Sequence, residues 1–93
     1  MCAIARLLSP HLIPMKYDAE LLEATSIVFR RLREESGLSQ EDLAAQSGVT
    51  RSMIDKVERR ERLPSLDILI RIAPSFRKSA SEIVSLVEIQ LDK

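Results

Sequence analysis

Two short helical segments separated by one glycine constrain this chain more strongly than any other feature. Ser39 precedes an amide and two carboxylates at positions 40–42. This order is typical of a helix start, because a hydroxyl caps the first turn and acidic side chains favour its positive end. The segment ends at Gly48, which can adopt the left-handed conformation of a tight turn. Thr50 is placed to cap a second helix directly after that turn.

The second of these helices is predicted to be amphipathic. Ile54 and Val57 lie three residues apart and share one face, which is expected to be buried. The opposite face carries Arg51, Ser52, Asp55, Lys56 and Arg59. Two short helices across a tight turn match a helix-turn-helix, whose second helix enters the DNA major groove with its exposed N-terminal half. A helical hairpin that serves only packing would show the same pattern.

The remainder of the chain favours an all-α domain with five helices. Its 93 residues and 45% hydrophobic content suit one compact core, and charged residues recur at helical spacing. Residues 17–36 predict a long first helix that stops at Gly37. Its core-facing stripe comprises Leu22, Thr25, Phe29 and Leu32. Ile27 and Val28 fall outside this stripe and are expected to meet an N-terminal extension or a partner chain.

Two further helices are predicted toward the C-terminus. Ser65 is expected to cap a fourth helix, and Pro74 is expected to kink that helix or end it early. The apolar positions of the fourth helix are Leu66, Leu69, Ile70, Ala73 and Phe76. A last helix spans about 79–91 and is capped by Ser79 or Ser81. Its apolar stripe comprises Ile83, Leu86, Val87 and Leu91.

Residues 1–16 are interpreted as a short N-terminal extension, and residues 17–93 as the domain itself. Two prolines prevent one continuous helix in the extension, which is therefore either a packed arm or disordered. The lone Cys2 cannot form an internal disulfide, and no familiar ligand spacing joins it to His11. We expect a cytoplasmic protein without metal or cofactor. The apolar start of the chain is interrupted well short of a membrane span and lacks the features of a signal peptide.

The charge of the chain gives a mixed indication. The formal net charge is zero, although phosphate neutralisation supplies much of the affinity of most nucleic-acid binders. Between Arg51 and Arg62 the chain carries five basic and three acidic residues. This run is either a local basic edge or an ordinary solvated face.

The run from Phe29 to Ala73 resembles the DNA-binding domain of the lambda-repressor-like family, which includes Cro-type phage repressors, restriction-modification controller proteins and several antitoxins. The matching parts occur in order: a Leu-Arg pair, GLSQEDLA at 37–44, the glycine turn, the second short helix and PSL at 64–66. The resemblance covers roughly residues 19 to 90. It implies the five-helix lambda-repressor-like fold.

The resemblance also implies roles for individual residues. Gln40, with the backbone N–H groups at its helix start, is expected to hold a DNA phosphate. The residues expected to meet phosphate or base edges are Thr50, Arg51, Ser52 and Lys56. Arg59 and Arg62 are expected to contact the phosphate backbone, unless they only balance neighbouring glutamates. Asp55 would repel phosphates, unless it accepts from a cytosine N4 or holds Arg51 or Arg59 in place.

Other matches and departures concern the framework of the domain. Arg33 and Glu58 match a pair that orients the first helix against the third, a structural role. Arg60 stands where the family commonly has glycine after the third helix. After the fourth helix, Arg77 and Lys78 replace a glycine and an apolar residue. Both loops are therefore expected to be altered.

The leading hypothesis is a transcription regulator of repressor or controller type. It would bind an inverted repeat in double-stranded DNA as a homodimer, because one short recognition helix reads only a few base pairs. The last helix is the predicted dimer interface, through Ile83, Leu86 and Val87. The alternative is that these residues only cover the first and fourth helices.

Other functions are kept open at this point. A prophage repressor and an antitoxin with a toxin partner both fit a domain of this kind. A protein-interaction module of the same fold, with weak or no DNA binding, is favoured by the zero net charge and by Asp55. No carboxylate pair, Cys/His arrangement or phosphate-binding glycine loop stands out in the sequence, so an enzyme is not expected.

Overall fold

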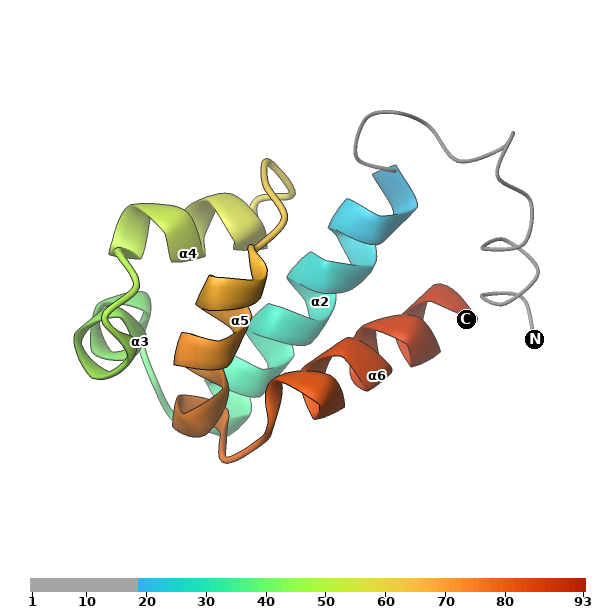
Figure 1. Ribbon diagram of the computed structural model, residues 1–93. Helices are drawn as coiled ribbons and strands as arrows, with labels where there is room; N and C mark the ends of the chain where they lie inside the picture. Colours follow the sequence, from blue (N-terminus) through green and yellow to red (C-terminus); the bar gives the residue numbers. More distant parts are fainter. Residues whose placement is uncertain (1–18) are drawn as a thin grey trace.

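The computed structural model describes residues 19–93, which form an all-α domain (Figure 1). Its elements are α2 (Ala19–Glu35), α3 (Gln40–Ser47), α4 (Arg51–Glu58), α5 (Leu66–Ile72), the 3-10 helix η2 (Ala73–Phe76) and α6 (Ala80–Leu91). Each helix expected from the sequence is present. The proposed extension at 1–16, with Cys2 and His11, lies outside the described residues. Within residues 19–93, no helix is both long and apolar enough to span a membrane.

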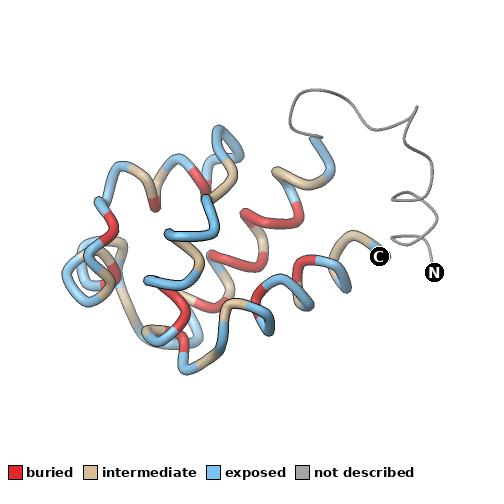
Figure 2. Tube along the Cα trace, viewed as in Figure 1, coloured by how far each residue is buried: buried red, intermediate tan, exposed pale blue. Residues whose placement is uncertain are grey.

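Helix α2 is the centre of the domain, because α6 packs along one of its sides and α4 along another (Figure 1). Phe29 on α2 meets Phe76 on η2 edge to face, with ring centroids 6.1 Å apart. Buried residues recur along α2 (Figure 2). Val28 is one of them and is fully buried in the core, so the expectation that it meets an extension or a partner chain is wrong. Because α4 and α6 cover two sides of α2, the buried face of α2 is wider than the single stripe predicted from the sequence.

Four helices begin at a hydroxyl that accepts a hydrogen bond from the backbone N–H three residues later. These hydroxyls belong to Ser39, Thr50, Ser65 and Ser79. Ser79, rather than Ser81, is the cap of α6, and Glu82 completes a capping box by accepting from the Ser79 backbone N–H at 2.8 Å. That hydrogen bond lowers the pKa of Glu82. The capping box therefore stabilises the domain above the pKa of an unfolded glutamate, and its contribution is lost as the pH falls through the lowered folded value.

The segment around Pro74 ends α5 early, as expected. α5 stops at Ile72, and the chain continues as the tighter helix η2 with Pro74 near its start. Two of the apolar positions of α5 lie outside the core, because Leu66 and Ile70 are 69% and 57% exposed. Ile72, outside the predicted set, is fully buried instead. α5 has only seven residues, so few of its side chains can face the core. Leu66 and Ile70 lie on the side of the helix that faces away from the core.

Four helix ends close through a residue in the left-handed conformation: Gly48 after α3, and three others that share one hydrogen-bond pattern. Gly37 after α2 has φ +71°, and Arg60 and Arg77 take the same conformation with φ +65° and +57°. In each case the following backbone N–H reaches back to a carbonyl five residues earlier, for example Glu61 N to Lys56 O at 2.9 Å. The loops thus keep the shape that glycine favours, although two of them carry arginine.

Replacing Arg60 or Arg77 by glycine is expected to raise the free energy of unfolding by about 1 kcal/mol per site, because left-handed backbone is strained when a Cβ is present. Urea unfolding followed by circular dichroism measures this change. Ser79→Ala serves as the opposite control and should lower stability by about 1 kcal/mol through loss of the α6 cap. Glycine variants no more stable than the parent chain would show that these loops are unstrained.

Candidate DNA-binding surface

Helix α4 is held across α3 by the turn at Gly48, which has φ +76°. Val49 in this turn is buried, and the Thr50 hydroxyl accepts from the Met53 backbone N–H at 3.2 Å. α4 buries Ile54 and Val57, each 1% exposed, as the sequence predicts. Its opposite side exposes Arg51, Ser52 and Lys56, followed by Arg59 and Arg62 in the loop. The residues expected to read DNA therefore lie on one accessible surface.

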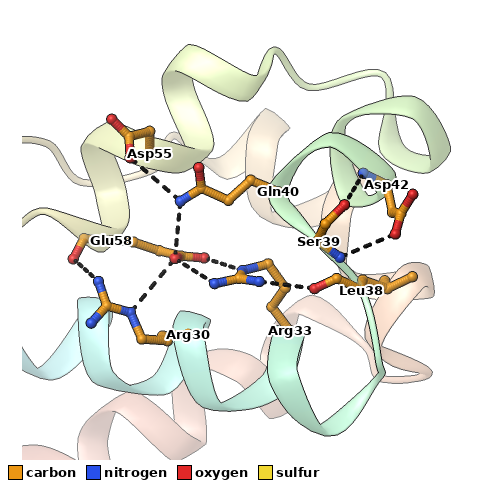
Figure 3. A network of polar contacts seen from close by, with 8 residues as sticks. All are labelled: Arg30, Arg33, Leu38, Ser39, Gln40, Asp42, Asp55 and Glu58. Atoms are coloured by element: carbon orange, nitrogen blue, oxygen red, sulfur yellow. Dashed lines mark hydrogen bonds and ion pairs between the residues drawn. The ribbon is translucent and has the colours of Figure 1, made fainter.

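The inner side of this surface is organised around the carboxylate of Glu58, whose side chain is only 1% exposed (Figure 3). Arg33 on α2 makes a two-pronged contact, with Nε donating to Oε2 at 2.7 Å and Nη2 donating to Oε1 at 3.0 Å. Arg33 Nη1 donates to the carbonyl of Leu38 at 2.8 Å. The hydrogen bond to Glu58 raises the pKa of Arg33. One ion pair thus joins α2, α4 and the segment that enters α3.

Gln40 also contacts Glu58, from the start of α3 (Figure 3). Its amide Nε2 donates to Glu58 Oε1 at 3.2 Å and lies 3.4 Å from Asp55 Oδ1. The amide expected to hold a DNA phosphate is therefore engaged with two carboxylates in this structure. A phosphate contact through this side chain would require the amide to leave at least one of them.

Arg30 is a member of this network that the sequence reasoning missed. Its Nη2 donates to the Glu58 backbone carbonyl at 3.2 Å, and its Nε lies 3.6 Å from Glu58 Oε1. Arg30 precedes Arg33 by three residues, so both lie on one face of α2. The three-residue spacing is visible in the sequence and could have predicted that Arg30 lies beside Arg33 and Glu58.

Acidic side chains pair with part of the basic surface of α4. Arg51 Nε lies 3.2 Å from Glu41 Oε2, and Arg59 lies 3.5 Å from Asp55 and 3.2 Å from Glu61. Asp55 therefore faces Arg59 rather than Arg51. These pairs are exposed, and such pairs contribute little to stability. Within residues 19–93, Lys56 and Arg62 have no ion-pair partner.

Two of the three side chains expected at a dimer interface are buried within the domain itself. Ile83 is fully buried and Val87 is 9% exposed, because both pack into the core formed by α2 and α6. Leu86 is partly buried against the same core. The apolar stripe of α6 thus covers the domain itself, and the exposed apolar residues on α6 are Val84 and Ile89.

Arg33→Met is expected to lower the free energy of unfolding by about 3 kcal/mol, because it leaves a buried carboxylate without its main partner. Adding Glu58→Leu should recover a large part of this loss, since the double variant contains no unpaired buried charge. Urea unfolding of both variants tests the prediction. A double variant that is less stable than Arg33→Met alone would show that the charge pair itself, and not the orphaned carboxylate, controls stability.

Comparison with known proteins agrees with this geometry. A family model described as helix-turn-helix matches residues 29–83. The uncharacterized HTH-type transcriptional regulator y4dJ of Sinorhizobium fredii is 37% identical over 57 residues, covering 61% of this chain and 74% of that protein. Both the family model and the name of this relative describe a helix-turn-helix protein, and the relative is named as a transcriptional regulator.

Solved structures show the same fold. The restriction-modification controller protein C.Esp1396I superposes with a TM-score of 0.69 at 30% identity, covering 78% of this chain and 96% of that chain. Its tetramer in complex with its natural 35 base-pair operator gives the same TM-score. An HTH_3 family transcriptional regulator from Vibrio cholerae gives 0.66 at 28% identity, over 74% of this chain and 39% of that chain. The chain therefore belongs to the helix-turn-helix family of DNA-binding transcription regulators with a lambda-repressor-like domain.

Proposed function

We propose that this protein is a sequence-specific transcription regulator that reads an inverted-repeat operator as a homodimer. The observation that carries the proposal is the accessible surface of α4, which exposes Arg51, Ser52 and Lys56. The buried contact between Arg33 and Glu58 holds this helix in place. A recognition helix of eight residues reads only a few base pairs, so two copies are needed for useful affinity and specificity.

Base reading is assigned to the exposed side chains near the start of α4. Arg51 and Lys56 can donate to guanine O6 and N7, and Ser52 can donate or accept at a base edge. Arg51 would exchange its contact with Glu41 for one with DNA. Asp55, whose side chain is 36% exposed, is suited to accept from a cytosine N4.

Phosphate contacts are assigned to both flanks of the recognition helix. Gln40 and the backbone at the start of α3 would hold one strand, because a helix N-terminus favours an anion. Arg59, Arg62 and the hydroxyl of Thr50 would contact the backbone near α4. These contacts position the helix, and the base contacts supply the specificity.

A homodimer interface is assigned to three of the exposed apolar residues of α5 and α6, namely Leu66, Ile70 and Val84. Val84 also lines an apolar hollow of about 170 Å³ between α2, α5 and α6, together with Leu63 and Leu69. A second copy of this chain would cover these side chains. The operator complex of a structural neighbour, which contains a tetramer, supports self-association on DNA.

Selection of bound duplexes from random DNA is expected to enrich an inverted repeat. Arg51→Ala and Lys56→Ala should each weaken binding to the selected site by about tenfold or more, since a good base contact contributes about 1–3 kcal/mol. Lys93→Ala, at the end of the chain, serves as a control and should bind like the parent.

Fluorescence anisotropy at several salt concentrations measures these affinities, and binding should weaken steeply as salt increases. Failure to enrich any sequence, together with no binding at low salt, would contradict the proposed function. It would favour a protein-interaction module of the same fold.

The dimer assignment predicts that Leu66→Lys combined with Ile70→Lys gives a monomer in sedimentation equilibrium, because two charges would be placed in an apolar interface. Both side chains are more than half exposed, so the fold should be retained. Ile89→Lys, also at an exposed apolar position, should leave the dimer intact. A double-lysine variant that stays dimeric would exclude this face.

A further inference from the structure

Three arginines line one hollow of about 200 Å³ beside the C-terminal end of α4, on the flank of α2. They are Arg30 and Arg31 from α2 and Arg60 from the loop that follows α4. We infer that this hollow is an anion site that holds a DNA backbone phosphate outside the base-reading surface. The inference rests on the proposed function and adds a contact that the reading residues of α4 do not supply.

The backbone of Arg60 is the first observation in support. Arg60 adopts φ +65°, a conformation that a side chain disfavours and that glycine adopts without strain. Arg77 shares this conformation, so the strain alone does not mark a site; Arg60 differs because its side chain lines the hollow. The contact of Arg60 with Glu23 is long, at 3.7 Å, and both side chains are more than half exposed. This weak pair alone gives little reason for an arginine at such a position.

The position of Arg30 is the second observation. One edge of its guanidinium is held by the Glu58 backbone carbonyl at 3.2 Å, and the side chain is still 53% exposed. A guanidinium has five N–H donors, so several remain available to a ligand in the hollow. Because the hydrogen bond to Glu58 already restrains the Arg30 side chain, less conformational entropy is lost when it binds a ligand.

The charge around the hollow favours an anion. Besides the three arginines, the lining contains Glu34 and Glu58, and Glu58 is already bound in two-pronged fashion by Arg33. Arg31 forms no ion pair within residues 19–93. Guanidinium groups pair with phosphate oxygens through two parallel hydrogen bonds. Since a water molecule takes about 30 Å³, the hollow has room for an oxyanion with some of its hydration shell.

The location indicates that the anion belongs to DNA. Arg30 and Gln40 both approach Oε1 of Glu58 (Figure 3). Because Arg30 and Glu58 also line the hollow, it lies close to the proposed phosphate contact at the start of α3. A DNA strand that passes Gln40 would continue along α2 toward this hollow. The site would thus extend the backbone contact of each half-site.

Arg60→Gly is the decisive variant, because it should stabilise the fold and weaken DNA binding at the same time. The slope of log K against log salt is expected to become less steep by about 0.9 for the loss of one phosphate contact. Arg31→Ala should also make this slope less steep. Arg77→Gly is the matched control, since it also relieves a left-handed arginine but lies at the turn before α6. Its slope should equal that of the parent.

The slope is measured by fluorescence anisotropy with the duplex selected from random DNA. If Arg60→Gly and Arg31→Ala both keep the parental affinity and slope, the anion site is wrong and the proposed function stands. If Arg77→Gly weakens binding as much as Arg60→Gly, the effect is non-specific and the inference is also overturned. A parent protein that binds no duplex would instead overturn the proposed function, and with it this inference.

Discussion

Glu58 sits at the end of the recognition helix with its carboxylate almost fully buried, and the arrangement of the reading surface depends on the donors that surround it. Arg33 supplies two hydrogen bonds from α2, and Gln40 supplies one from α3. An isolated buried carboxylate is strongly unfavourable, so these helices must keep their positions for the charge to remain compensated. The same contacts set the angle of α4 against α2 and α3, and with it the orientation of the proposed DNA-binding surface.

Local features of the chain were readable from the sequence because each depends on a few neighbouring residues. The caps at Ser39 and Ser65, the turn at Gly48 and the interruption of the fourth helix near Pro74 are of this kind. The Arg33–Glu58 pair spans 25 residues, and only the resemblance to a known family suggested it. The bonds of Arg30 and Gln40 to Glu58 needed the three-dimensional arrangement.

The identity of the partner that covers an apolar stripe was not readable from the sequence. Periodicity shows that Ile83 and Val87 share a face of α6, but it cannot distinguish a helix of the same chain from that of a second copy. In the structure α2 covers them. Val28 was misassigned for a related reason, since α2 packs against α6 and α4 on different sides. The pairing of Arg51 with Glu41 likewise depends on how α3 and α4 cross.

The central claim is that α4 and its flanks, including the start of α3, form the surface that contacts DNA. Backbone amide chemical shifts of the ¹⁵N-labelled protein, recorded during titration with the selected duplex, test it most directly. The account predicts that the largest changes lie at the start of α3, along the exposed side of α4 and in the loop through Arg62. The exposed residues at the end of α6 should change little. Changes concentrated on α6, with α4 unaffected, would contradict the account.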